Sequence, residues 1–440
     1  MALYLNYTPP IRNEYADLVA GQSIACVDSF ILESGVELRN VNIAYKIWGS
    51  LNTKGDNCLV LCHALTGSSD VEDWWGPLIG SGKPFDTSRY FIFCANLLGS
   101  PYGSSSPLSV NPDAGRIYGP DFPQTTIRDD IRLHKQILDA LNVTSVTAVI
   151  GGSMGGMTTL EWPLCTPKGY VKTIIPIATS ADHSAWGIAW GEAQRQCIYA
   201  DPQFEDGYYL PTPATQPAVG LAAARMAALL TYRSCSSFQT RFGRGLDSSR
   251  DRRKGGKPVL PISEVTPVRT GELLDTPPGS CTPEPDDCSI VPDLPIVLTP
   301  KHFQRKMNST TNPLFSAQSY LRYQGQKFIR RFDANCYIHL TYKMDLHDVT
   351  RDRCADLQSS TRLEQHVQLS KVLSAVPPGA LVIGVESDEL FRLESQELLA
   401  KALPEATLSI LKSPEGHDGF LLEFEKLGEL IQEHLMKQYP

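Results

Sequence analysis

The sequence has no hydrophobic run long enough to cross a membrane, although 42% of its 440 residues are apolar. Its first thirty residues lack a basic start that leads into an apolar stretch, so we expect no secretory signal. The eleven cysteines have the spacing of neither a disulfide framework nor a metal site, and we predict no bound metal. These absences together favour a globular protein of the reducing cytoplasm, with no membrane partner.

The sequence also has fewer basic than acidic residues. The 40 Lys and Arg against 48 Asp and Glu leave a net charge of −8, which disfavours binding to nucleic acid or to an anionic membrane surface. The chain shows no glycine-rich phosphate cradle either, and we expect no tightly bound cofactor.

Strand-like and helix-like segments alternate over 20–182 and again over 366–440. This rhythm predicts a mostly parallel sheet flanked by helices, an α/β domain built from both segments. Residues 183–365 interrupt it, and we predict an inserted helical lid over the carboxyl edge of the sheet. Within the lid, the proline-rich stretch 244–300 has no sustained periodicity and is predicted to be a disordered surface loop.

The individual elements follow from runs of apolar residues and from their periodicity. Thr126 and Asp129 form a predicted capping box at the start of one helix. The predicted strands are 36–47, 58–62, 90–95, 146–150, 173–178, 380–386 and 406–411; the predicted helices are 127–141, 221–232, 320–332, 366–376, 390–401 and 420–437.

Ser153 is the candidate nucleophile. It lies in the segment GGSMG (151–155), directly after the β-branched run VTAVI (146–150) and before a segment that can begin a helix. A G-x-S-x-G nucleophile elbow requires this context, because a sharp turn between strand and helix raises the serine hydroxyl to the rim of the sheet. The alternative is a tight turn with a surface serine.

A serine hydroxyl needs an imidazole base, and the imidazole needs a carboxylate to orient it. Asp388 follows the predicted strand 380–386, and His417 follows the predicted strand 406–411. The order Ser153, Asp388, His417 is that of α/β-hydrolase triads. Glu386 remains a rival carboxylate, and an isolated Asp or His at these places would suggest a helix cap or a surface residue.

Two backbone N–H groups are needed to stabilise the oxyanion of an acyl-transfer reaction. Met154, directly after the nucleophile, supplies the first candidate, and its place at the start of a helix favours negative charge. We select Leu65, in the segment HALTG (63–67), for the second. His63 is an alternative base, but it adjoins this segment and is expected to support it instead.

Several sequence blocks together resemble the homoserine O-acetyltransferase family, particularly its fungal form. The resemblance covers nearly the whole chain except roughly 244–300. It implies an α/β-hydrolase fold with a helical lid, usually a homodimer, that transfers acetyl from acetyl-CoA to the γ-hydroxyl of L-homoserine for methionine biosynthesis. The blocks are HALTG (63–67), DWW (73–75), NLLGS (96–100), TIRD (126–129), GGSMGGM (151–157) and GHD (416–418).

By this resemblance Ser153 forms an acetyl-enzyme and the kinetics are ping-pong, with acetyl-CoA as a co-substrate. The family's acceptor site carries over to Arg225, Tyr232 and Asp418, and we expect Thr66 to contact substrate as well. A guanidinium suits the carboxylate of an amino acid, and a carboxylate suits its ammonium group. Without the family, Arg225 would be a solvated position on a mostly apolar helix and Asp418 a helix cap.

Three other functions share parts of this pattern. An acetyltransferase of secondary metabolism, of the deacetylcephalosporin C type, has the same elbow. Ala64, Gly67 and Gly152 instead favour the homoserine branch. A serine esterase would use the same triad without Arg225 and Asp418, and a non-catalytic binding protein of this fold would have a broken triad.

Overall fold

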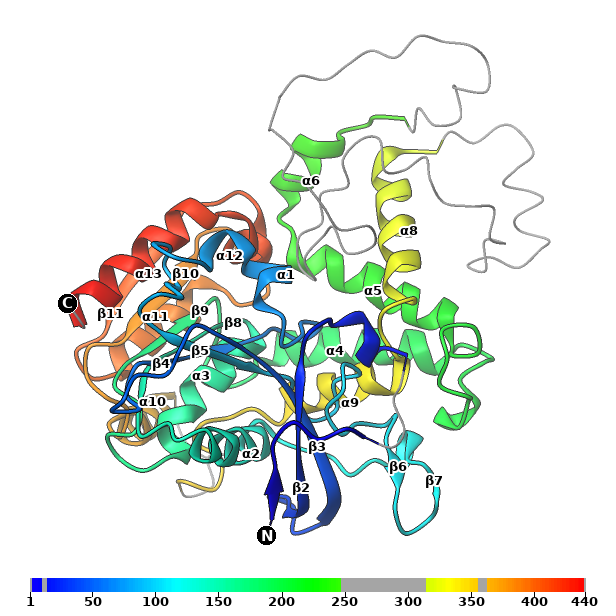
Figure 1. Cartoon of the computed structure of the whole chain (residues 1–440). Helices are drawn as coiled ribbons and strands as arrows, with labels where there is room; N and C mark the ends of the chain where they lie inside the picture. Colours follow the sequence, from blue (N-terminus) through cyan, green and yellow to red (C-terminus); the bar gives the residue numbers. More distant parts are fainter. Residues whose placement is uncertain (1, 10–13, 247–313, 355–361, 439–440) are drawn as a thin grey trace.

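The computed structural model describes residues 2–9, 14–246, 314–354 and 362–438 (Figure 1). The proline-rich loop predicted at 244–300 falls outside the described residues from 247 onward.

A nine-stranded sheet is the centre of the described fold, with the strand order β1-β2-β3-β5-β4-β8-β9-β10-β11. The six strands from β5 to β11 in this order are parallel, and β1, β2 and β3 extend the sheet antiparallel at one edge. The predicted mostly parallel sheet is therefore confirmed. The strands are β1 (Leu3–Tyr4), β2 (Ser23–Ile31), β3 (Glu37–Trp48), β4 (Cys58–Cys62), β5 (Phe91–Ala95), β8 (Val146–Gly152), β9 (Ile174–Ile177), β10 (Leu381–Val385) and β11 (Thr407–Leu411), with β6 (Val110–Asn111) and β7 (Arg116–Ile117) as a separate pair.

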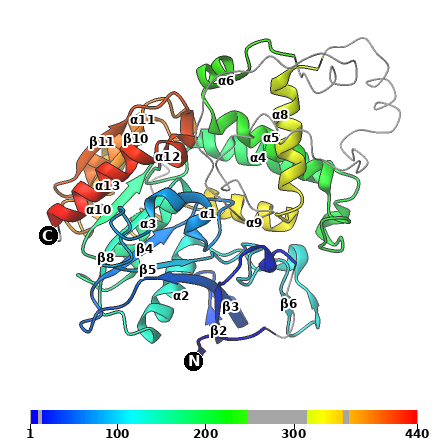
Figure 2. The same ribbon diagram turned by 45° about the horizontal axis from the view of Figure 1, so that its top comes forward.

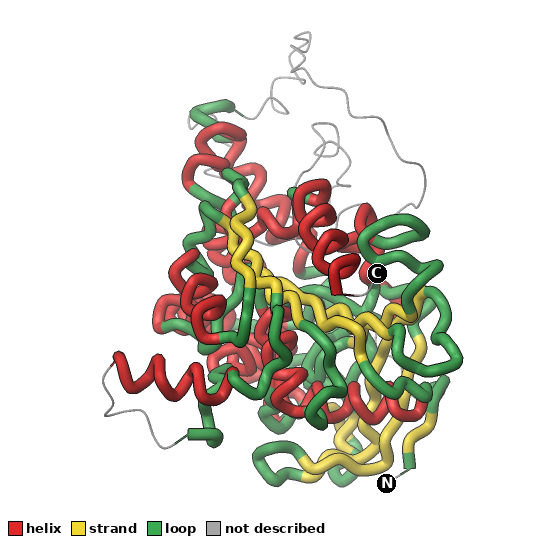
Figure 3. Tube along the Cα trace, turned by 90° about the vertical axis from the view of Figure 1, so that its left-hand side faces the viewer, coloured by secondary structure: helices red, strands yellow, loops and turns green. Residues whose placement is uncertain are grey.

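Helices cover both faces of this sheet (Figure 3). Alternate residues of a strand point to opposite faces, so Val60 of β4 joins the apolar cluster under α2, α3 and α11. Leu59 and Leu61 join the cluster under α1 and α13. The helices are α1 (Val71–Trp75), α2 (Ile127–Ala140), α3 (Met154–Cys165), α4 (Ala185–Tyr199), α5 (Ala218–Tyr232), α6 (Cys235–Phe242), α8 (Ser316–Phe328), α9 (Ala334–Asp345), α10 (Arg362–Leu373), α11 (Leu393–Ala402), α12 (Gly419–Leu422) and α13 (Phe424–Gln438).

The helices α4, α5, α6, α8 and α9 follow β9 in the chain and gather on one side of the sheet (Figure 2). They lie in the region predicted as a lid at 183–365, and we call these five helices the lid helices; that they act as a lid stays a prediction. Two of them, α5 and α8, correspond to the helices predicted at 221–232 and 320–332. The sequence did not predict α4 and α9, and it missed strand β2.

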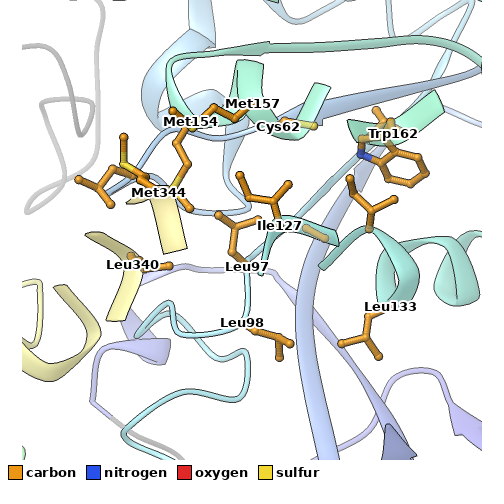
Figure 4. Packing of buried hydrophobic residues seen from close by; sticks show 14 of the residues in the cluster. Cys62, Leu97, Leu98, Ile127, Leu133, Met154, Met157, Trp162, Leu340 and Met344 are labelled. Carbon is orange, nitrogen blue, oxygen red and sulfur yellow. The ribbon is translucent and has the colours of Figure 1, made fainter. Parts of the chain in front are cut away.

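The lid helices share one apolar core with the sheet domain. Leu340 and Met344 of α9 belong to the same buried cluster as Leu97 and as Met154 and Met157 of α3 (Figure 4). Burial of such side chains contributes roughly 1.5–3 kcal/mol each. The lid is therefore packed on the sheet domain as part of one core.

A fully buried ion pair adds to this attachment. Lys343 Nζ of α9 lies 2.5 Å from Asp130 Oδ2 of α2 and donates to the Leu98 carbonyl at 2.8 Å, while Asp130 Oδ1 accepts from the Leu98 N–H. The lid helix, α2 and the loop after β5 are thus joined at one point.

All six predicted helices differ from the observed ones in at least one boundary, and one of them is divided in two. The helix predicted at 420–437 is interrupted at Glu423, whose ψ of 54° separates α12 from α13. The helix predicted at 127–141 ends at Ala140, and its Thr126–Asp129 capping box is confirmed by both reciprocal hydrogen bonds.

Candidate active site

Ser153 lies on the sharp turn between β8 and α3 with φ 59° and ψ −125°. A side chain in this conformation costs of order 1–3 kcal/mol, and such strain is typical of functional sites. The turn also requires small neighbours: a Cβ at Gly155 would lie 2.1 Å from the Cys62 carbonyl oxygen, and one at Gly151 would lie 2.4 Å from the Gly155 carbonyl oxygen. The local geometry is that of a nucleophile elbow.

His417 and Asp388 lie on loops at the ends of two parallel strands. The loop after β10 carries Asp388, and a short 3-10 turn after β11, Gly416–Asp418, carries His417. His417 Nδ1 and Asp388 Oδ2 are 2.6 Å apart, and both residues are buried. The exposed Glu386, the rival in the sequence, does not make this contact.

The second oxygen of Asp388 accepts the N–H groups of Leu390 at 2.8 Å and Phe391 at 2.9 Å. These bonds fix the plane of the carboxylate and therefore the orientation of the imidazole. Asp388 therefore does both: its Oδ1 accepts backbone N–H groups, as a capping Asp would, and its Oδ2 contacts His417.

Burial by itself would lower the pKa of His417, but the charge and hydrogen bond of Asp388, with a contribution from Asp418, raise this pKa above its ordinary value of 6.5. Three rings surround the imidazole, with centroids at 5.2 Å for Phe391, 5.3 Å for Phe420 and 6.0 Å for Tyr232. The imidazole is therefore enclosed by aromatic walls and charged partners.

Ser153 and His417 line one cavity. Leu65, in the loop after β4, borders it, and Met154 begins α3, so its N–H has no partner within the helix. The predicted substrate residues Thr66, Tyr232 and Asp418 lie in the same wall. The remaining lining residues are Ala64, Gly67, Trp74, Phe420 and Leu421.

Arg225, like Asp388 and Met154, is a predicted site residue that does not itself line this cavity. Its guanidinium lies 5.5 Å from the centroid of Tyr232 and 4.9 Å from that of Phe328, with only 3% of the residue exposed. Six of the nine predicted residues thus line the cavity, Asp388 and Met154 adjoin it through His417 and Ser153, and Arg225 lies against Tyr232. The catalytic and binding roles of all nine remain predictions.

Asp418 is a buried carboxylate in the cavity wall. Burial raises its pKa to about 6, against the lowering influence of Arg233, His417 and Arg225. It occupies the N-cap position of α12 but makes no capping hydrogen bond there. Its Oδ2 is 3.1 Å from Arg233 Nε and accepts no hydrogen bond of normal geometry from the described residues.

His63 has a supporting position. Its Nδ1 is 2.8 Å from the Ala64 carbonyl oxygen, and its Nε2 is 3.4 Å from the Leu97 N–H nitrogen. Burial lowers its pKa to about 4, so the ring is neutral at physiological pH. The imidazole links the segment that carries Leu65 to the loop after β5, and it does not line the cavity at Ser153.

Sequence reasoning missed a second cavity at the nucleophile. Ser153, Leu65 and Tyr232 also border a space lined by Gly187, Trp190, Gly191 and Gln194 of α4. Their spacing of three, four and seven residues is that of one helix face, and it would have been the available signal. Sequence reasoning also missed Arg233, which pairs with Asp418 of the cavity wall and with Glu415.

The described residues contain no group of three or more His, Cys, Asp or Glu placed to hold a metal ion. Among them, no helix combines the length and the apolar character needed to cross a membrane.

Comparison with protein families finds a match to the alpha/beta hydrolase fold over residues 57–262. A homoserine O-acetyltransferase of Cryptococcus neoformans is 48% identical over 98% of this chain and 91% of that protein. Those of Emericella nidulans and Saccharomyces cerevisiae are 47% and 46% identical, over 98% and 96% of this chain and 89% and 88% of theirs.

Solved structures show the same fold at lower identity. The homoserine O-acetyltransferase of Bacillus anthracis superposes with a TM-score of 0.70 at 20% identity, covering 94% of this chain and 97% of that one. Esterase E22 superposes with a TM-score of 0.69 at 22% identity, covering 94% and 99%. The fold class is thereby established independently of the sequence pattern.

Proposed function

This chain belongs to the homoserine O-acetyltransferase family, and on that premise we propose that it transfers acetyl from acetyl-CoA to the γ-hydroxyl of L-homoserine through an acetyl-enzyme on Ser153. The observation that carries the proposal is the shared cavity: Ser153, the Asp388-bonded His417 and the buried Asp418 all line it. A nucleophile, its base and a receptor for a cation are the parts that acyl transfer to an amino acid requires.

In the first half-reaction His417 accepts the proton of Ser153 as the serine oxygen attacks the thioester carbonyl. With Nδ1 donating to Asp388, Nε2 is the nitrogen available to accept this proton. The N–H groups of Leu65 and Met154 receive the developing oxyanion. The C–S bond then breaks, the departing thiolate of CoA takes from His417 the proton that came from Ser153, and acetyl remains on Ser153.

In the second half-reaction the γ-hydroxyl of homoserine gives its proton to His417 and attacks the acetyl-enzyme. The bond to Ser153 breaks, His417 returns the proton to the serine oxygen, and O-acetylhomoserine leaves. Water must be kept from the acetyl-enzyme for transfer to exceed hydrolysis. The lid residue Tyr232 and the aromatic walls around His417 provide that enclosure.

Asp418 is the residue we assign to the ammonium group of the acceptor. Asp418 lines the cavity beside Ser153 and His417, and a carboxylate suits an ammonium group. Tyr232 and Thr66 line the same wall, and Arg225 lies directly behind Tyr232, where its charge favours the acceptor's carboxylate.

The decisive experiment incubates the protein and acetyl-CoA with homoserine, with serine or with a deacetylated cephalosporin, and measures thiol release and product mass. We expect thiol release to depend on homoserine and to yield O-acetylhomoserine. Ser153→Ala should abolish it. Preference for the bulky acceptor would favour the secondary-metabolite enzyme, and free acetate as the main product would favour an esterase. Failure of a covalent serine probe to label Ser153 in the folded protein would favour a binding protein.

We further propose that the enzyme is a cytoplasmic homodimer of methionine biosynthesis, with acetyl-CoA as a co-substrate and no tightly bound cofactor. Large apolar side chains on the lid, Trp186 of α4 at 54% and Leu230 of α5 at 52%, are exposed in the single chain. Light scattering should give twice the chain mass, and Trp186→Glu is expected to reduce it. A monomer at micromolar concentration would contradict the dimer.

A further inference from the structure

The segment 232–237, which covers the end of α5 and the start of α6, is hydrogen-bonded to the loop that carries His417. Ser234 Oγ donates to the Pro414 carbonyl, and Ser237 Oγ donates to Glu415 Oε2 at 2.6 Å. Gly416, with φ 71°, comes so close that a Cβ there would lie 2.5 Å from the Ser234 nitrogen. The lid and the histidine loop therefore meet along an interface with no room for a side chain at this point.

Arg233 is the charged centre of this interface. Its Nη1 pairs with Glu415 Oε2, and its Nε lies 3.1 Å from Asp418 Oδ2. The side chains of Arg233 and Asp418 are 4% and 3% exposed, whereas that of Glu415 is 30% exposed. The buried guanidinium of Arg233 thus lies between the partly exposed carboxylate of Glu415 and the buried carboxylate of Asp418.

A buried carboxylate tends to take up a proton and become neutral, because burial disfavours its charged form. The charged and titratable groups that face Asp418 are Arg233 and Arg225 from the lid and His417 and Glu415 from its own loop. The cations and His417 favour ionisation of Asp418, with Arg233 contributing most among them, and Glu415 opposes it. A neutral Asp418 would have no charge with which to bind an ammonium group.

We propose that Arg233 is a positioning residue of the acceptor site, which holds Asp418 in place and in its charged form so that the cavity selects an acceptor carrying an ammonium group. Glu415 has the opposite influence on Asp418 and shares the same guanidinium. This inference rests on the proposed function, because it assumes that Asp418 binds the ammonium group of homoserine.

The test is the pH dependence of the KM for homoserine. In the wild-type enzyme this KM should rise as the pH falls through about 6, where Asp418 takes up its proton. Arg233→Met removes the strongest opposing cation, so the rise should begin at higher pH. A pKa change of about one unit would raise KM about threefold at pH ~6.5 and leave it nearly unchanged at pH ~8.5.

Glu415→Gln provides the opposite change in the same interface. It removes a negative charge but keeps an oxygen that accepts from Ser237, so the rise in KM should move to lower pH. Arg233→Lys keeps the positive charge and should restore most of the wild-type profile. Arg39→Met, at an exposed arginine paired with Asp113, is the matched control and should leave the profile unchanged. If Arg233 had only a structural role, the pH profiles of Arg233→Met and Glu415→Gln would not shift in opposite directions.

Acylation of Ser153 by p-nitrophenyl acetate, which has no ammonium group, separates changes at His417 from changes at Asp418. Either of two results would overturn the inference. In the first, Arg233→Met raises the homoserine KM equally at all pH values; in the second, Glu415→Gln shifts the pH profile in the same direction as Arg233→Met. If Arg233→Met does not fold, the Glu415→Gln and Arg233→Lys profiles carry the test.

Two outcomes distinguish this inference from the function beneath it. If the wild-type protein makes no O-acetylhomoserine, or if Asp418→Asn leaves the homoserine KM unchanged, the acceptor assignment itself is wrong. If Asp418→Asn raises that KM while the Arg233→Met profile matches wild type, the proposed function stands and only the role of Arg233 is refuted.

Discussion

Replacement of Gly155 by Ala tests how closely the nucleophile turn and the oxyanion loop are packed. Gly155 is the second residue of α3, and the new methyl group would lie 2.1 Å from the carbonyl oxygen and 2.8 Å from the carbonyl carbon of Cys62. Cys62 is the last residue of β4 and leads into the segment that carries Leu65. The position of the new Cβ is fixed by the backbone of residue 155, and the Cys62 carbonyl is itself backbone, so no side-chain rotation relieves the clash.

The contact must widen from 2.1 Å to beyond 3.0 Å, below which real Cβ contacts are essentially never found. The start of α3 and the end of β4 would thus separate by about 1 Å, at the overpacking cost of ~1–3 kcal/mol. Met154 and Leu65 lie on the two sides of this separation. A misplacement of about 1 Å between such groups lowers a catalysed rate by roughly 100-fold.

Two measurements follow, denaturant unfolding for stability and the burst of p-nitrophenol from p-nitrophenyl acetate for acylation of Ser153. The matched control is Gly76→Ala, where a Cβ meets nothing within 4 Å and φ is −49°, so both readings should stay near wild type. Wild-type stability together with a wild-type burst in Gly155→Ala would refute this account of the turn.

Three further predictions concern the buried charges. Asp388→Asn should lower kcat by about 10⁴ without unfolding the protein, because the amide no longer fixes the required tautomer of His417; a loss below tenfold in the acylation assay would contradict this role. The base must be neutral, and Asp388 raises the pKa of His417, so kcat/KM for acylation should fall as the pH drops through a value above 6.5; an acid limb below that value would be inconsistent. Lys343→Met should destabilise by roughly 3–5 kcal/mol in denaturant unfolding, because it leaves Asp130 buried without its partner. Asp130→Leu added to Lys343→Met should recover part of that loss, and a double variant less stable than Lys343→Met would count against the explanation.

The parallel strands were predictable because they are short apolar runs buried on both faces. The strand predicted at 58–62 coincides with β4, Cys58–Cys62, all of whose residues are buried. The capping box at Thr126 was predictable for a similar reason, since it depends only on residues three apart. In such places local sequence and tertiary environment favour the same structure.

Helix α4 was missed because its apolar and small residues do not follow the pattern of an amphipathic helix. Trp186 is 54% exposed, while Gly187, Gly191 and Gln194 are buried against the second cavity and the neighbouring helices. Apolar residues on an exposed face and glycines on a buried one blur the helical period. The break at Glu423 was missed because the apolar pattern continues across it.

Fold class, the order of nucleophile, carboxylate and base, and the family resemblance could be predicted from the residues, because these depend on short motifs and on the alternation of strands and helices. The folded chain was needed to show that Asp388 rather than Glu386 bonds to His417, that Arg225 lies against Tyr232, and that Arg233 lies between Glu415 and Asp418. Burial and charge pairing depend on distances between residues far apart in the chain, which no short motif contains. Arg233 and Asp418 are separated by most of the lid and the last part of the sheet, and no local pattern records that they meet.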